Sequence, residues 1–404
     1  MTIDHTYRDL LLLSGERRAL STEHEILSMR RRDFLKALSG GMLAVAMGPF
    51  GTAAVIGCGA ATRPKLNVRA EAASVRMLDP DSAAILAYAS LAPSTHNTQP
   101  WRVRIQEPGH WIIGSDPARR LLEVDPLNRE MLLSLGAFTE NLVLAAGALG
   151  HTAVTTIIAG NPFMPEVMDV RLTRAPAVSY PFERITLRRT VRRNYRDREL
   201  AGDVVRTLLA PLGDGATFFP PISRPAAYLR EAVVEAFRAQ TYREQAQVEL
   251  SHWIRFDDAD VYRHRDGLTP ASMELSSAAA WYARHFMSRD DVMTGRFRVE
   301  GIDIVAKQAR HGGGWFVVTS DHWDVTSLLD AGRRFERMAL LAREHGVAIH
   351  PMSQVLEEKP WQERLAVDMD VPGNPQFILR AGYVSPYPAP VSLRRPIASF
   401  VSLA

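Results

Sequence analysis

The chain shows the same succession of predicted elements twice. In the first, a helix over residues 83–91 is followed by a longer helix that carries apolar residues on one face and stops at Gly150. In the second, a helix over 204–212 is followed by a long helix over 325–345, which stops at Gly346. A chain that repeats its pattern in this way is predicted to fold as two similar halves.

Strand-like segments accompany both long helices. Residues 101–105 alternate between apolar and polar, and residues 111–113 are a candidate hairpin partner, while 167–172 form a further strand. In the second succession, 315–319 form a short buried strand and 377–383 a closing strand. The sequence therefore predicts an α+β fold in which sheets are flanked by helices.

The predicted halves cover residues 79–180 and 181–404. A junction near Pro181 is indicated because a new helical start with many arginines follows it. Within the second half, residues 228–306 are richer in charged and aromatic residues and have no counterpart in the first half. We expect this stretch to form a helical insertion or lid.

Residues 1–58 predict an export signal. Arg31 and Arg32 precede an apolar run rich in small residues, a pattern that resembles the twin-arginine signal. The end of the run resembles a lipoprotein box, which would place a lipid on Cys58 and leave 404 − 57 = 347 residues. An uncleaved membrane anchor over residues 37–61 is the alternative. We expect export by the twin-arginine translocase to a periplasmic or membrane-attached location, with residues 59–78 as a linker.

Composition excludes several classes of site. A formal net charge of +3 over 404 residues gives no concentrated basic stripe, so nucleic acid is not an expected partner. A single cysteine excludes intrachain disulfides and every multi-cysteine metal site. None of the 12 histidines forms a metal pair at helical spacing, and no metal is expected. His311 precedes three glycines as in an esterase oxyanion loop, but no nucleophile-elbow motif exists.

A polar loop at residues 92–101 is the first candidate for binding. It places hydroxyls, an imidazole and two carboxamides within a few residues after a helix end. Such a loop can hydrogen-bond a flat polar heterocycle, because each carboxamide offers both donors and an acceptor. A polar turn that caps its neighbours is the alternative. The candidate side chains are Ser94, Thr95, His96, Asn97 and Gln99.

A cluster of arginines at residues 187–195 is the second candidate. Four arginines surround Thr190 at what the pattern predicts to be the start of a helix. Guanidinium groups and a hydroxyl at a helix start form a phosphate cradle, although a solvated basic turn is the alternative. Arg394 and Arg395, near the C-terminus, are candidates for the same role or for a salt-bridging tail.

Together these segments resemble the FMN-binding nitroreductase-like superfamily. The loop at 92–101 is similar to its flavin-ring loop, and residues 188–192 are similar to its phosphate-binding segment, which opens the domain in ordinary members. The inverted order here, with residues 140–146 and 351–354, resembles the fused-dimer branch of FMN-binding proteins known from mycobacterial dormancy. The resemblance covers nearly everything from residue 79 to 401. It implies a nitroreductase-like fold, a monomeric pseudo-dimer of two tandem halves, and one flavin site.

The resemblance also implies a set of cofactor-binding residues. The arginine segment and the C-terminal tail would hold the FMN phosphate, and the polar loop would line the ribityl chain and the ring. Met352 and Ser353 replace an acidic residue and a glycine that face the reactive flavin nitrogen in ordinary members. The implied residues are Ser94, Thr95, His96, Asn97, Gln99, Arg188, Thr190, Arg192, Pro351, Met352, Ser353, Arg394 and Arg395.

The expected function is that of an FMN-dependent oxidoreductase. NADH, NADPH or another donor would reduce the flavin, and a small electron-poor substrate such as a nitroaromatic or a quinone would reoxidise it. Flavin supplies its own redox chemistry, so no dedicated catalytic residue is expected. The replaced segment at 351–353 and the insertion favour the alternative, an FMN storage or sequestration protein without turnover. A degenerate protein that binds no flavin is a third reading.

Overall fold

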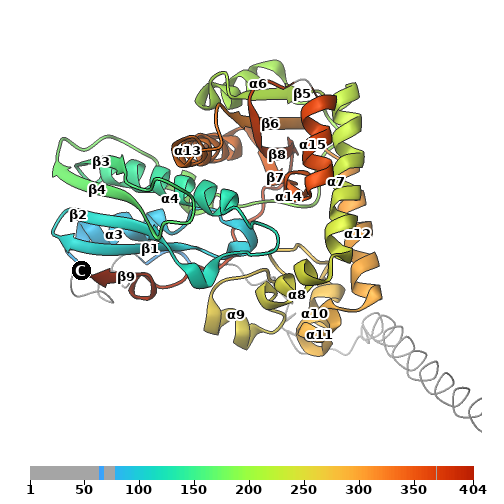
Figure 1. Ribbon diagram of the computed structural model, residues 1–404, viewed down its shortest axis with the longest axis horizontal. Helices are drawn as coiled ribbons and strands as arrows, with labels where there is room; N and C mark the ends of the chain where they lie inside the picture. The colour runs from blue at the N-terminus through green and yellow to red at the C-terminus, as the bar shows by residue number, and fades with distance from the viewer. Residues whose placement is uncertain (1–62, 68–77, 370) are drawn as a thin grey trace, which may run out of the picture. The chain divides into compact units, whose positions relative to one another are not determined.

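The computed structural model describes residues 63–67, 78–369 and 371–404 (Figure 1). The predicted export signal, with Arg31, Arg32 and Cys58, lies outside these residues. Among the helices in the described ranges, α4 (Arg129–Ala148) alone is long and apolar enough to cross a membrane, and 78% of its apolar window is buried within the protein.

The first sheet has five strands in the order β3-β4-β2-β1-β9. Neighbours among the first four are antiparallel, whereas β9, at the C-terminus, runs parallel to β1. The predicted hairpin is confirmed, because Val103 of β1 is paired with Ile113 of β2. The strands are β1 (Trp101–Glu107), β2 (His110–Ser115), β3 (His151–Ile157), β4 (Glu166–Arg174) and β9 (Val401–Leu403).

The second sheet has four antiparallel strands in the order β5-β6-β8-β7. Read from the other edge, its order β7-β8-β6-β5 matches β3-β4-β2-β1 of the first sheet, strand for strand in chain order. The predicted α+β class is confirmed, and the two-sheet layout is consistent with a pseudo-dimer. The strands are β5 (Ala216–Phe219), β6 (Gly314–Ser320), β7 (Val347–Pro351) and β8 (Asn374–Tyr383).

Helices α4 and α13 (Val325–Ala342) pack against each other between the two sheets (Figure 1). They approach so closely because each has a glycine at the crossing. A Cβ atom at Gly136 would lie 2.1 Å from the Leu329 carbonyl oxygen, and one at Gly332 would lie 2.1 Å from the Leu133 carbonyl oxygen. The two glycines are 332 − 136 = 196 residues apart, and the two leucines that they contact, Leu133 and Leu329, are the same number of residues apart. The contacts at the crossing are therefore reciprocal.

Local signals fix the ends of several helices. The Asp79 carboxylate accepts from the backbone N–H groups of Asp81 and Ser82, so α3 (Pro80–Ala89) begins at Pro80. Gly150 and Gly346 follow the two long helices with positive φ angles of 76° and 64°, a conformation that glycine adopts without strain. Both glycines were predicted as helix stops.

Six helices, α7 to α12, lie between β5 and β6, where the first half has only the two-residue turn between β1 and β2. Helices α7 and α12 run side by side along the second sheet (Figure 1). The bounds of these and the remaining α-helices are α5 (Glu183–Leu187), α6 (Gly202–Leu209), α7 (Arg224–Tyr242), α8 (Glu244–Trp253), α9 (Asp258–His264), α10 (Ser277–Phe286), α11 (Arg289–Val292), α12 (Gly295–Arg310), α14 (Gln354–Glu357) and α15 (Lys359–Asp368).

The predicted helix start at the arginine cluster is wrong. Helix α5 ends at Leu187, before the cluster, and residues 188–201 contain no helix. Arg188 is extended, and the chain instead runs along the second sheet, where Arg196 N–H donates to the Tyr383 carbonyl at 2.9 Å. A helix dipole therefore makes no contribution to binding at these arginines.

Candidate functional site

The polar loop between α3 and β1 has an unusual backbone. His96, Asn97 and Gln99 have positive φ angles of 49°, 54° and 52°. Each such residue costs on the order of 1 kcal/mol, and conformations of this kind cluster at binding sites. The Ser94 hydroxyl accepts from Gln99 N–H at 2.9 Å, and the Thr95 hydroxyl donates to Glu130 Oε2 at 2.7 Å. The loop is therefore held in a strained shape by its own side chains and by α4.

The two carboxamides of the loop contact other parts of the protein. The Gln99 amide donates to the Arg265 carbonyl at 2.8 Å, and its oxygen accepts from Arg395 N–H at 2.8 Å. Asn97 Nδ2 lies 3.3 Å from the Gly267 carbonyl, and its oxygen accepts from Arg394 Nη1 at 3.1 Å. These two side chains thus join the loop to the insertion and to the C-terminal tail. A flavin ring would bind them only by sharing or replacing these partners.

His96 brings the loop close to the arginine cluster. Its Nδ1 atom is buried and has no hydrogen-bond partner in the described part of the chain. Burial lowers the pKa of His96 to about 4, the nearby Glu130 opposes that shift, and the positive charge of Arg192 adds to it. The imidazole is therefore neutral at physiological pH and offers a ring nitrogen to a ligand.

The tail arginines shape the loop. The Arg394 guanidinium donates to the carbonyls of Ser90, Leu91 and Ala92 at 2.9 to 3.1 Å, where α3 gives way to the loop. Arg395 Nη2 donates to the Gln99 carbonyl at 2.7 Å. Arg394 and Arg395 were predicted as phosphate ligands, and the structure shows both guanidiniums already engaged by backbone oxygens.

Part of the predicted phosphate cradle holds a carboxylate of the insertion. Glu274 accepts from Arg192 N–H at 2.8 Å, from Arg193 N–H at 2.7 Å and from the Arg189 guanidinium. In addition, Arg192 Nη1 donates to the Ser272 carbonyl at 2.7 Å. Sequence reasoning missed Glu274, because nothing in its neighbourhood points to a partner that lies more than 80 residues earlier.

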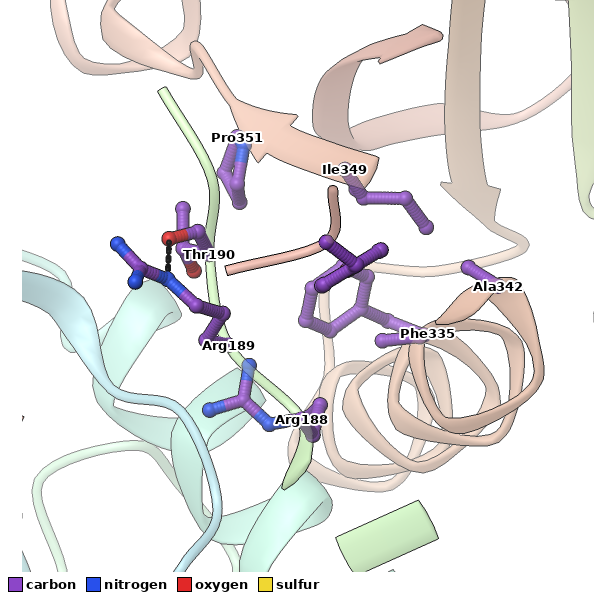
Figure 2. A pocket seen from close by; sticks show the side chains of 9 residues that line it. Arg188, Arg189, Thr190, Phe335, Ala342, Ile349 and Pro351 are labelled. Atoms are coloured by element: carbon purple, nitrogen blue, oxygen red, sulfur yellow. Dashed lines mark hydrogen bonds between the residues drawn. The ribbon is translucent and has the colours of Figure 1, made fainter. Parts of the chain in front are cut away.

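Arg188 lies at a small cavity that Arg189, the partner of Glu274, also lines (Figure 2). The cavity is partly open to solvent and has room for about one water molecule. Arg188 is buried, and its Nε atom lies 3.5 Å from Glu336 Oε1 without hydrogen-bonding to any described residue. The cavity is lined by Arg188, Arg189, Thr190, Phe335, Ala339, Ala342, Ile349, Pro351 and Tyr387.

The charges at this cavity fit an anionic ligand. Burial raises the pKa of Glu336 to about 7, although the nearby Arg188 opposes the shift, so the carboxyl is only partly ionised at neutral pH. Burial lowers the pKa of Arg394, and the positive charges of Arg63 and Arg188 lower it further. A phosphate monoester would pair with this excess of buried positive charge.

The segment at 351–353 is only partly at the cavity. Pro351 lines it, as Figure 2 shows, but Met352 is fully buried in a hydrophobic cluster with Trp315 and Val355. The Ser353 hydroxyl lies 3.4 Å from Ile378 N–H. The Met352 side chain therefore packs into the core, where it does not meet a ligand in the cavity.

Comparisons with known proteins support the resemblance to the nitroreductase-like superfamily. The chain is 27% identical over 336 residues to a Mycobacterium tuberculosis protein named as a putative NAD(P)H nitroreductase, covering 78% of this chain and 90% of that protein. It is 26% identical over 318 residues to the probable NAD(P)H nitroreductase PigM of a Serratia species, covering 73% of this chain and 86% of PigM. No family model matches the chain.

Among solved structures, the chain is similar to the FMN-dependent nitroreductase NfnB from Mycobacterium smegmatis in complex with NADPH. The TM-score is 0.34 at 16% identity, and the match covers 50% of this chain and 86% of NfnB. It is also similar to a nitroreductase-like family protein from Bacillus cereus, with a TM-score of 0.32 at 14% identity, covering 57% of this chain and 99% of that protein.

Proposed function

We propose that the protein is an FMN-dependent oxidoreductase that takes electrons from NADH or NADPH and reduces small electron-poor compounds such as nitroaromatics or quinones. The relatives named as NAD(P)H nitroreductases support the reaction class. The observation that carries the proposal is the meeting of a strained polar loop with buried arginines that exceed their carboxylates, at Arg188 and Arg394. A ligand with a flat polar ring and a phosphate matches both parts.

The chain's own residues divide the work of binding. Arg188 and Arg394, with Thr190 at the cavity, would neutralise the phosphate, and neutral His96 with the loop hydroxyls would contact the ring and ribityl chain. Bound FMN supplies the hydride chemistry. The protein orients the cofactor and excludes water, and no side chain is required as an acid or base.

A single flavin site in a fused pseudo-dimer is part of the proposal. Glu140 of α4 and Glu336 of α13 stand at equivalent positions, four residues after the crossing glycines. Glu140 is bound by Arg333 at 2.9 Å and by Arg337 at 2.7 Å, whereas Glu336 faces Arg188. The two arginines near Glu140 are thus already paired with its carboxylate rather than available to a second phosphate. This supports one cofactor site in a monomeric protein.

The first experiment is an absorption spectrum of the protein purified without added flavin, followed by rapid mixing with NADPH or NADH. We expect flavin bands in the purified or FMN-reconstituted protein, and their bleaching by at least one pyridine nucleotide. Mixing the reduced protein with a quinone should restore the bands. A protein that stays colourless after incubation with FMN would disprove the cofactor, and bound flavin that no donor bleaches would disprove turnover.

A second candidate function, FMN storage without turnover, is favoured by one contact pattern. Residues 265–274 of the insertion, which we call the strap, bind the polar loop through Asn97 and Gln99, and bind the arginine cluster through Glu274. A strap tied to both parts of the site would slow the exchange of cofactor and restrict access of substrates. Flavin that is bound but not bleached would select this function.

We also propose that the protein is exported by the twin-arginine route, with a lipid on Cys58. That route carries folded proteins, which agrees with insertion of a cofactor before export. We expect Arg31→Lys/Arg32→Lys to leave the protein in the cytoplasm, as measured by cell fractionation. Cys58→Ser should abolish lipid labelling while export continues. Unchanged fractionation of the double variant would exclude this route.

A further inference from the structure

Residues 63–67, which precede α3 in the chain, place the partly buried Arg63 near the arginines of the candidate site. Arg63 N–H donates to the Pro390 carbonyl at 2.8 Å, and the Arg63 guanidinium donates to the Thr186 carbonyl. These two partners lie four residues before Arg394 and two residues before Arg188. The segment is therefore held between the two chain regions that supply the arginines of the candidate site.

The charge of Arg63 acts on the same arginines. Burial lowers the pKa of Arg63 to about 10, and the positive charge of Arg188 contributes to the shift. After burial itself, Arg63 is the largest influence that lowers the pKa of Arg394. Glu336 also faces this cluster, and it is only partly ionised at neutral pH. Glu336 lies 3.5 Å from Arg188 Nε and its charge also acts on Arg394, so among the described residues one partly ionised carboxyl faces both of these buried guanidiniums.

We infer that Arg63 is a third phosphate-binding arginine and that residues 63–67 contribute to the cofactor site. The inference rests on the proposed function, because the anion in question is the phosphate monoester of FMN. A guanidinium suits this role, since it remains charged and offers several donors beyond the one used on Thr186. Phosphate binding would relieve the mutual repulsion of the three cations.

A purely structural role for Arg63 makes a different prediction. If its guanidinium only ties the chain to Thr186, its loss should affect every flavin equally, because the pocket as a whole would loosen. If it neutralises the phosphate, its loss should affect FMN and spare riboflavin, which has the same ring and ribityl chain but no phosphate. The ratio of the two affinities therefore separates the roles.

The test uses the apo form of the full chain and measures the affinities for FMN and riboflavin by quenching of flavin fluorescence. Arg63→Gln should weaken FMN binding by about tenfold or more, as expected for loss of a hydrogen bond to a charged group, and leave riboflavin binding unchanged. Lys65→Gln, an exposed neighbour on the same segment, is the matched control and should change neither affinity. Arg63→Lys keeps the charge and should give an intermediate loss for FMN.

Two results would overturn the inference while the proposed function stands. One is FMN affinity in Arg63→Gln equal to that of Lys65→Gln, and the other is an equal loss for FMN and riboflavin. Thermal unfolding of each variant identifies any that fail to fold. If Arg63→Gln fails to fold, the FMN and riboflavin affinities of Arg63→Lys decide between the two roles. Absence of flavin binding by the wild-type protein would overturn the inference together with the proposed function.

Discussion

Gly332→Ala is expected to lower the free energy of unfolding by about 3 kcal/mol, the upper end of what overpacking in a core usually costs. The new Cβ atom would lie 2.1 Å from the Leu133 carbonyl oxygen, and 2.8 and 2.9 Å from two further backbone atoms of the same residue. Backbone atoms of a helix cannot swing aside as a flexible side chain can. Helices α4 and α13 would have to separate, which loosens packing along their whole contact.

Denaturant unfolding measures this effect, and α4 supplies a matched control. Gly147 lies on the same helix as Gly136, but a Cβ atom there would meet no atom of the described residues within 4 Å. Gly147→Ala should therefore stabilise the protein by about 0.5 to 1 kcal/mol through its higher helix propensity. Gly136→Ala should behave like Gly332→Ala. If Gly332→Ala were as stable as wild type, the close crossing of α4 and α13 would be disproved.

Periodicity predicted the elements of the fold because each is determined locally. The alternating strand at 101–105 and the helix stops at Gly150 and Gly346 are set by neighbours in the sequence, and the structure confirms them. Periodicity did not predict the reason for a glycine at position 332. That reason lies at Leu133, 199 residues earlier, and periodicity does not report such a contact.

The candidate site was predicted by residue type more than by geometry. The sequence identified the polar loop and the arginine cluster, and the structure brings them together through His96 and Arg192. It could not show that Glu274 accepts hydrogen bonds from the cluster, nor that Glu336 faces Arg188. Both carboxylates come from segments far along the chain, so their partners depend on how the insertion and α13 pack.

The helix start predicted at the arginines failed for a related reason. Dense arginines after a junction are typical of a helix, and no proline or glycine interrupts residues 188–195. In the structure, the Arg380 guanidinium lies 4.0 Å from the centre of the Tyr195 ring and donates to the Arg192 carbonyl at 2.8 Å. These contacts with β8 stabilise an extended chain, and tertiary packing overrides the local preference.

Glu274→Ala is expected to loosen one end of the strap and to speed the release of FMN by about tenfold or more, since a hydrogen-bonded carboxylate contributes about 1.5 to 3 kcal/mol. The carboxylate accepts from two backbone N–H groups and one guanidinium, and its own carbonyl accepts from Arg193 Nη1 at 2.8 Å. Loss of the side chain leaves Arg189 and the two amides without their common acceptor. The strap would then be held by its contacts with Asn97 and Gln99 and by the hydrogen bonds that Arg192 and Arg193 donate to its backbone carbonyls.

Dissociation of FMN can be followed by the rise of flavin fluorescence after the loaded protein is diluted into buffer, with Glu300→Ala as the control. Glu300 lies in the same insertion, but it is exposed and, among the described residues, pairs with Arg296 alone, so its loss should leave the rate unchanged. Faster release from Glu274→Ala with unchanged bleaching by NADPH would identify the strap as a barrier to cofactor exchange alone. If bleaching appeared only in Glu274→Ala, the wild-type strap would be excluding the electron donor, as a storage protein requires. Equal release rates in wild type and Glu274→Ala would show that the carboxylate does not hold the site closed, and the case for storage would lose its main support.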